Sequence, residues 1–175
     1  MQMNIRVLIE SDAVIYQELR LKALKNNPEA FGSTFERESK FTKQMIVDRI
    51  KPTENKFVLG AFDENMVLVG MVTFMREASP KTIHKANIFG MFVAPEARGK
   101  SIGKSLLLEL IKMAKKCNGV EQLNLTVVSE NKPAKKLYES LGFKVYGVER
   151  NALKFNGKYY DEDLMAFYIN RMDTI

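Results

Sequence analysis

A turn rich in cations and glycine is the clearest candidate for chemistry in this sequence. It lies in the stretch 88–104 (IFGMFVAPEARGKSIGK), where an apolar segment leads into a helical pattern. Backbone amides at a helix start have no partner within the helix and point outward with the positive end of its dipole, so they suit phosphate oxygens. The cations of the turn are Arg98, Lys100 and Lys104, and its glycines are Gly99 and Gly103. We expect a diphosphate site here, although the spacing fits neither the P-loop NTPase motif nor the dinucleotide-binding motif.

A second segment, 131–143 (NKPAKKLYESLGF), places an asparagine and a tyrosine on one short predicted helix. By spacing alone Tyr138 is a core residue on an apolar face, because it falls four residues after Ala134. Asn131 has the residue type of a helix N-cap. The residues by themselves therefore favour structural roles for both side chains.

Together the two segments resemble the GCN5-related N-acetyltransferase (GNAT) family. The family's acetyl-CoA motif is [QR]-x-x-G-x-[GA] after a strand that ends in V-x-P, and here Val93-Ala94-Pro95 precedes a match at 98–103. The segment 131–143 matches the family's pattern N-x-x-A-x-x-L-Y-x-x-x-G-F. The two motifs stand in the family's order, separated by a predicted helix and strand, and the resemblance covers residues 86–146.

The resemblance implies acetyl-CoA as the cosubstrate and gives individual residues their roles. Tyr138 would protonate the departing thiolate of coenzyme A. The main chain of Met91, Phe92 and Val93 would hold the pantetheine arm and the acetyl group in a gap between two splayed strands. The further cofactor contacts that it implies are Arg98, Gly99, Lys100, Ser101, Ile102, Gly103, Lys104, Asn131 and Lys136.

One position departs from the family's pattern, because Ser101 stands where the first required glycine is usual. If the backbone at Ser101 has a positive φ, the serine side chain carries a steric cost. If φ is negative the change is harmless, since the amide is retained and a hydroxyl is gained. The sequence leaves both alternatives open.

The general base is less well defined than the acid. An alkylamine with a pKa of about 10.4 is almost entirely protonated at neutral pH, so a base must remove a proton before attack. Family members often place a carboxylate on the strand before the cofactor turn, but 86–93 contains none. The remaining candidates are Glu36, Glu38, His84 and Glu162.

The acceptor cleft is predicted from two regions that border it in the family, the segment after the first helix and the terminal hairpin. The corresponding residues are Phe31, Phe35, Glu36, Asp161 and Glu162. Taken alone, Phe31 and Phe35 favour packing roles, and the acids are also explained as solvated surface charges. As functional residues, the acids of these regions, with Glu38, would create a negative local field that attracts a cationic amine to a chain of net charge +6.

Composition indicates a folded protein and makes nucleic-acid binding the minor interpretation. With 175 residues, 46% hydrophobic and 27% charged, we expect one domain spanning 1–175. Lysines cluster within 112–116 and 132–136, but no RNP, helix-turn-helix or zinc-ligand pattern accompanies them.

No apolar run approaches the ~20 residues that cross a bilayer, and the first residues do not read as a signal peptide, so we expect a cytoplasmic protein. A metal is not expected, and a homodimer is one expected assembly.

Hydrophobic periodicity and turn residues predict an α/β fold with a mixed, mostly antiparallel sheet flanked by helices. A loop is expected at 29–35, and helix caps at Ser11-Asp12 and Thr42. The expected strands are 4–9, 56–62, 66–76, 83–93, 122–128, 144–153 and 159–170. The expected helices are 13–26, 43–50, 102–117 and 133–141.

The sequence therefore predicts an acetyl-CoA-dependent N-acetyltransferase. It would move the acetyl group to a primary amine of a small molecule, peptide or protein by direct attack in a ternary complex. The alternative is a non-catalytic acyl-CoA-binding regulatory domain. Ser101 and the missing strand carboxylate favour that alternative, whereas Tyr138 opposes it, because a binding domain has no need of an acid.

Overall fold

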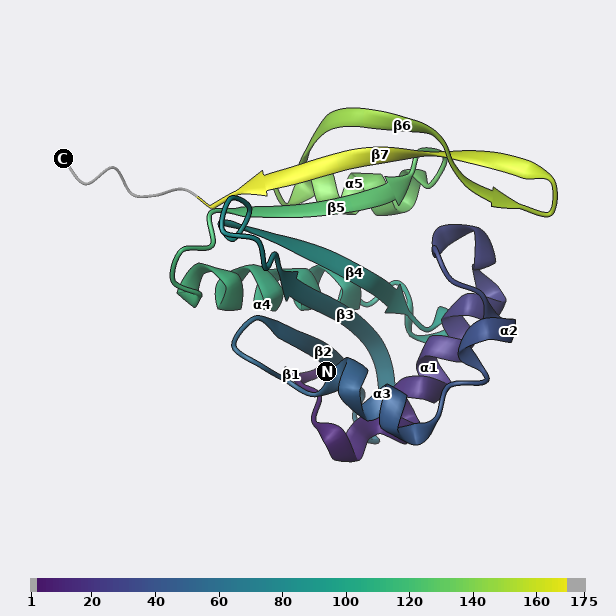
Figure 1. The fold of residues 1–175 in the computed structure, drawn as a ribbon. Coiled ribbons are helices and arrows are strands. Elements are labelled where there is room, and N and C mark those ends of the chain that lie inside the picture. Colours follow the sequence, from purple (N-terminus) through teal and green to yellow (C-terminus); the bar gives the residue numbers. More distant parts are fainter. Residues whose placement is uncertain (1–2, 170–175) are drawn as a thin grey trace.

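The computed structural model describes residues 3–169, and over this range the chain forms one sheet covered by helices (Figure 1). The strands of this range are β1 (Asn4–Val7), β2 (Lys56–Phe62), β3 (Leu68–Arg76), β4 (Lys85–Val93), β5 (Gln122–Val128), β6 (Lys144–Phe155) and β7 (Lys158–Tyr168). The helices are α1 (Ala13–Asn26), α2 (Phe35–Glu38), α3 (Lys43–Ile50), α4 (Ile102–Lys116) and α5 (Lys132–Ser140). The strand order is β1-β2-β3-β4-β5-β7-β6, with β4 and β5 parallel and the other neighbours antiparallel. The predicted mixed, mostly antiparallel sheet is confirmed.

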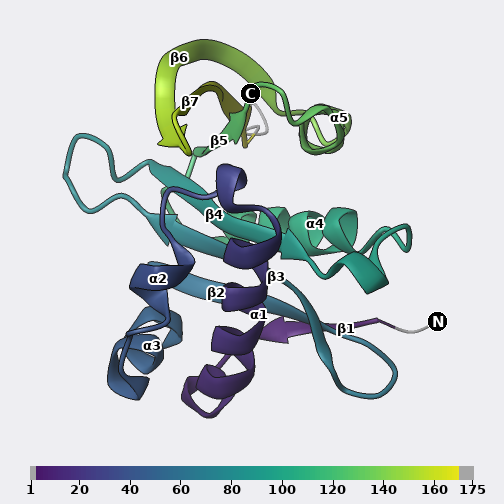
Figure 2. The ribbon, with the colours of Figure 1, turned by 90° about the vertical axis from the view of Figure 1, so that its right-hand side faces the viewer.

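Helices cover both sides of the sheet, and Figure 2 shows α1, α2 and α3 gathered on the side away from α4. Helix α4 buries one apolar stripe because its apolar residues recur at helical spacing. The buried residues of α4 are Ile102, Leu106, Leu107, Leu110, Ile111 and Ala114. Thr42 caps α3 as predicted, since its hydroxyl accepts a hydrogen bond from the Met45 amide at 3.2 Å. Among the described helices none is long and apolar enough to cross a membrane.

The sheet opens between β4 and β5, as the prediction of splayed central strands requires. The two strands pair only over Lys85–Asn87 and Gln122–Asn124. Beyond these residues β4 stays paired with β3, and β5 stays paired with β7, so the two halves of the sheet diverge (Figure 1). The register between β3 and β4 shifts near Gly90, whose φ of 59° marks a bulge that bends β4 away.

Several predicted boundaries near the N-terminus differ from the structure. Strand β1 ends at Val7 rather than Ile9, because Asp12 accepts a hydrogen bond from the Ile9 amide at 2.8 Å and folds the chain into a tight turn. Asp12 therefore precedes α1 without capping it through its side chain. Strand β3 begins at Leu68 rather than Met66, whose φ of 61° belongs to the preceding turn.

The segment 29–35 is more structured than the predicted loop. It contains most of a 3-10 turn at Pro28–Ala30 and leads into α2, where the Thr34 hydroxyl accepts from the Arg37 amide at 3.2 Å. A helix of one turn is too short to show a hydrophobic period, so the sequence pattern could not reveal it. At the terminal hairpin β6 extends past the predicted end, to Phe155, and the predicted end of β7 at residue 170 lies outside the described residues.

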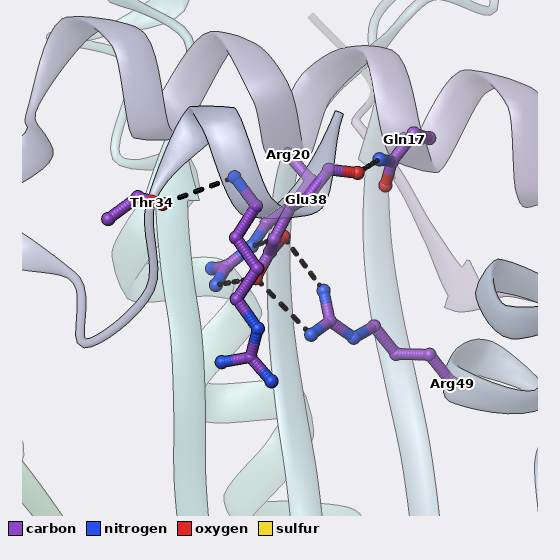
Figure 3. A network of polar contacts seen from close by, with 6 residues as sticks. Gln17, Arg20, Thr34, Glu38 and Arg49 are labelled. Carbon is purple, nitrogen blue, oxygen red and sulfur yellow. Dashed lines mark hydrogen bonds and ion pairs between the residues drawn. The ribbon is translucent and has the colours of Figure 1, made fainter. Parts of the chain in front are cut away.

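Glu38 fixes α2 to its neighbours through the contacts in Figure 3. Its side chain is fully buried, and its carboxylate accepts hydrogen bonds from Arg20 at 2.9 and 3.0 Å and from Arg49 at 2.9 and 3.3 Å. Its main-chain carbonyl accepts from Gln17 at 2.8 Å. Burial alone would raise the pKa of Glu38, but the two guanidinium groups outweigh burial and lower the pKa to about 2. Glu38, predicted as a candidate base, is therefore an ionised residue that holds the fold.

Replacing Glu38 with glutamine should lower the free energy of unfolding at pH 7 by about 3 kcal/mol, because one pKa unit corresponds to about 1.4 kcal/mol. A carboxylate whose pKa is lowered from 4.5 to about 2 on folding stabilises the protein fully above pH 4.5 and loses this effect as the pH falls towards 2. The difference between parent and variant should therefore shrink over that interval. Urea unfolding at about pH 7, 4.5 and 3 measures it.

The matched control is Glu36→Gln, which neutralises an exposed acid on the same helical turn. This control should change stability by less than about 0.5 kcal/mol. A Glu38→Gln protein that is as stable as the parent at pH 7 would show that the network contributes nothing to folding.

Candidate active site

The gap between β4 and β5 holds a cavity of about 910 Å³. Its walls are residues 88–93 of β4 and 125–128 of β5, and the start of α4, the segment 30–32 and α5 complete it. The predicted cofactor residues that line it are Met91, Phe92, Val93, Arg98, Gly99, Ser101, Ile102, Gly103, Lys104 and Asn131. Lys100 and Lys136 are exposed and lie outside this lining. The structure thus brings together most residues of the two sequence motifs.

The predicted phosphate turn opens α4. The first hydrogen bond of the helix runs from the Ser105 amide to the Ser101 carbonyl at 3.0 Å, so the amides of Ile102, Gly103 and Lys104 have no acceptor within the helix. These amides and the positive end of the helix dipole suit an anion. Ser101 itself has φ 58° and ψ 21°, in the left-handed region. The steric cost that the sequence left open therefore applies.

Gly103 lies where α4 approaches both walls of the cavity. A Cβ atom at this position would stand 2.9 Å from the Met91 Cε of β4 and 3.3 Å from the Leu137 Cδ2 of α5. A larger residue would displace these side chains from the cavity floor. Both atoms are the far ends of flexible side chains, so glycine allows the close approach without a shift of Met91 or Leu137.

Arg98 is fixed beside the phosphate turn. Its Nε donates to the Val93 carbonyl at 3.1 Å, and its Nη2 donates to the Asn27 side chain at 3.3 Å. Its guanidinium carbon lies 5.7 Å from the centre of the Phe92 ring. These contacts hold one positive charge at the edge of the cavity, next to the free amides of α4.

Tyr138 combines the structural and the functional interpretation. It is 7% exposed, its ring packs edge-on against Phe143 with centroids 6.0 Å apart, and it also lines the cavity. Burial raises its pKa to about 12, so the hydroxyl keeps its proton at neutral pH. Asn131 likewise has two roles, since it caps α5 by accepting from the Ala134 amide at 3.3 Å and borders the cavity.

Among the described residues, Glu162 is the only Asp or Glu that lines the cavity. It lies on β7 between Val128 of β5 and Glu149 of β6. Burial, and then repulsion from Glu149, raises its pKa, while a hydrogen bond with Thr126 partly offsets them. A carboxylate with a raised pKa in a cleft has the properties of a general base.

Asp161 does not join Glu162 in the cavity. Successive residues of a strand point to opposite faces of the sheet, so the two side chains point apart. The Asp161 carboxylate accepts from the Arg150 guanidinium at 2.7 Å and from the Asn151 amide at 2.8 Å. With Glu38 buried under its arginines, the predicted gathering of carboxylates at one cleft is wrong.

Phe35 and Glu36 border a second cavity of about 450 Å³. It lies between the segment 28–36 and residues 153–155 of β6. Phe31 borders both cavities and packs edge-on against Phe92, with centroids 6.4 Å apart. His84 precedes β4 at its paired end, away from the bulge.

Arg20 and Thr126 are among the cavity-lining residues that were not predicted from the sequence. Arg20 is one of several cations on α1, and its side-chain hydrogen bonds are made to Glu38 of α2. Thr126 is an ordinary strand residue of β5. No local pattern distinguishes either residue, because only the packing of distant elements brings them to the gap.

Comparison with known proteins agrees with this geometry. A family model described as an acetyltransferase (GNAT) domain matches residues 5–164. The chain belongs to the GNAT family. Its members are acetyl-CoA-dependent N-acetyltransferases, and none of the comparisons supports the alternative of a non-catalytic binding domain.

Named GNAT relatives match this chain over different lengths. The L-amino acid N-acetyltransferase AaaT of Escherichia coli is 31% identical over 99 residues, which are 57% of this chain and 60% of AaaT. YokL, an N-acetyltransferase of the SPbeta prophage in Bacillus subtilis, is 27% identical over 162 residues, or 91% of this chain and 85% of YokL. The yncA structure from Salmonella typhimurium, solved with its cofactor acetyl-CoA, has a TM-score of 0.80 at 21% identity and covers 100% of this chain and 98% of yncA. That likeness shows a shared fold.

Replacing Ser101 with glycine should stabilise this GNAT domain by about 0.5–1 kcal/mol, because a residue with a Cβ is strained in the left-handed region and glycine is not. Urea unfolding measures the change. Ser105→Gly is the matched control, since Ser105 lies inside α4 and the same substitution there should cost about 0.5 kcal/mol. If Ser101→Gly destabilises the protein as Ser105→Gly does, the turn is not strained at Ser101.

Proposed function

We propose that this N-acetyltransferase binds acetyl-CoA in the gap between β4 and β5 and transfers the acetyl group directly to a primary amine in a ternary complex. One observation carries the proposal: a single cavity joins the anion-binding start of α4 to Tyr138 on α5 and Glu162 on β7. Phosphate binding, an acid and a base therefore share one volume. Direct transfer needs these three features and no covalent enzyme intermediate.

The cofactor fits this cavity from its charged end inward. The free amides of Ile102, Gly103 and Lys104, with the Arg98 guanidinium, would bind the diphosphate. The pantetheine arm would lie along the side of β4 that faces the gap, where β5 no longer pairs with it. Exposed Lys100 and Lys136 would act on the phosphates through their field.

Glu162 would accept one proton in the reaction, and Tyr138 would donate another. Glu162 takes a proton from the acceptor ammonium, and the free amine attacks the thioester carbon. The carbon–sulfur bond then breaks, and its electron pair leaves on sulfur. The Tyr138 hydroxyl, neutral because its pKa is about 12, donates to that sulfur and is reprotonated from the proton released by the acetylated nitrogen.

The Tyr138→Phe variant should keep its acetyl-CoA affinity and lose turnover by roughly 10²-fold at neutral pH, the usual size of a general-acid contribution. The loss should shrink at alkaline pH, because a thiol of pKa about 8.5 then leaves as thiolate without help. Steady-state kinetics and calorimetric titration give the two quantities. Tyr16→Phe, at a buried tyrosine outside the cavity lining, is the control. Equal turnover of Tyr138→Phe and Tyr16→Phe, with chemistry rate-limiting, would leave Tyr138 as a packing residue.

The Glu162→Gln variant should lose roughly 10²-fold in kcat/KM, because the base that activates the amine is removed. In the parent enzyme kcat/KM should rise with pH through the raised pKa of Glu162, since only the carboxylate form accepts a proton. This rise, the acidic limb of the pH profile of kcat/KM, should be missing from the variant. Glu139→Gln, at an exposed acid of α5 outside the cavity lining, should keep both the rate and the limb. A Glu162→Gln profile that retains the limb would assign the base elsewhere.

Other expectations from the sequence belong to the same proposal. We infer one domain over 1–175, a cytoplasmic location and a homodimer, which limited proteolysis, cell fractionation and light scattering test. Phe31, at the edge of both cavities, would border the acceptor. Phe35, Glu36 and Asp161 remain predicted acceptor contacts. Phe35 and Glu36 would contact the acceptor from the second cavity, which they line.

A further inference from the structure

Arg20 reaches from α1 to the cavity with one edge of its guanidinium group unused. Its Nε and Nη2 donate to Glu38 at 2.9 and 3.0 Å, whereas its Nη1 has no hydrogen-bond partner among the described residues. Nη1 lies 3.6 Å from the position of a Cβ built on Gly90, so it stands beside the bulge of β4. The guanidinium carbon also lies 4.9 Å from the centre of the Phe31 ring. These contacts fix the orientation of the free edge.

Arg20 belongs to a cluster of three side chains whose net charge is positive. Glu38 is shared between Arg20 and Arg49, so the three side chains together carry one positive charge. The Arg20 side chain is 11% exposed and lines the cavity, while Arg49 does not line it. A positive charge with little access to water binds an anion more strongly than an exposed one does. Its free N–H donors therefore form a site for an anionic group.

The charges around the cavity separate into two regions. Arg98 and Lys104 stand at the turn that opens α4, where the cofactor phosphates would bind. Arg20 stands apart from them, at the bulge of β4. Glu162 lies on the far side of the gap, on β7. An acceptor between Arg20 and Glu162 therefore meets a cation on one side and a carboxylate on the other.

We propose that Nη1 of Arg20 binds a carboxylate of the acceptor, so that the acceptor is an amine that also carries a carboxylate, as an amino acid does. This inference rests on the proposed function, because it places the acceptor amine beside Glu162. A zwitterion matches both walls of the gap. A polyamine would instead leave Nη1 of Arg20 without an acceptor and bring further cations towards a cluster that already carries a net positive charge, at a cost in binding.

The first test compares acceptors on the parent enzyme and needs no variant. Free amino acids, their amides and the corresponding decarboxylated amines are offered with acetyl-CoA, and acetylated product is measured by mass spectrometry. Rates are compared per unprotonated amine, because removing the carboxylate changes the amine pKa. For at least one side chain in the panel, kcat/KM should be more than tenfold higher for the free amino acid than for its amide and its decarboxylated amine.

The second test assigns that preference to Arg20. Arg20→Gln should raise the KM of the preferred amino acid at least tenfold and leave kcat/KM for its amide within threefold. Arg49→Gln is the matched control, because it removes the other partner of the same buried carboxylate but does not line the cavity. It should keep the preference of the parent. Thermal unfolding of both variants shows that each is folded at the assay temperature.

The outcomes separate this inference from the proposed function. Acetylation of amides and decarboxylated amines as readily as free amino acids would overturn the carboxylate site and leave the proposed function intact. Equal loss of preference in Arg20→Gln and Arg49→Gln would also overturn it, because Arg20 would then act only through Glu38. Acetylation of no amine by an enzyme that binds acetyl-CoA would overturn the proposed function, and this inference with it.

Discussion

The early end of pairing between β4 and β5 is the constraint on which the rest of the structure depends. The two strands share a ladder only over Lys85–Asn87 and Gln122–Asn124. Each remains paired on its other side, with β3 and β7, so the outer ladders continue past the gap, the one between β3 and β4 with a bulge. The bulge at Gly90 directs β4 away, and α4 begins just beyond its end. One departure from regular pairing thus creates the cavity and places a helix start at its edge.

The two walls of the gap differ in character because different elements support them. On the β5 side, β7 carries Glu162 and α5 carries Tyr138, so the titratable groups lie together. On the β4 side, the polar groups are backbone amides and a guanidinium held by Glu38. That carboxylate belongs to the core as much as to the site, because it ties α1, α2 and α3 together. Folding and the charge of the cavity are therefore linked through one buried residue.

Much of this architecture could be predicted from the sequence, because the relevant signals are local. The apolar stripe of α4 and the Thr42 cap of α3 each specify an element within a few residues. The one-turn helix α2 and the left-handed backbone of Ser101 left no such signal. Side chains alternate between the two faces of a strand, so the sequence already implied that Asp161 and Glu162 lie on opposite faces. The prediction that both acids border one cleft did not take this alternation into account. Arg20 could not be found, since its role comes from packing between distant segments.

The central claim is that acetyl-CoA occupies the open half of the strand pair. Hydrogen exchange resolved to single amides, with and without saturating acetyl-CoA, tests this directly. The account predicts slower exchange at residues 91–93 and 102–104 on cofactor binding, and little change at 85–87 and 122–124, where the strands already pair. Unchanged exchange at 91–93 and 102–104 in a cofactor-saturated protein would contradict it, because the cofactor would then bind elsewhere.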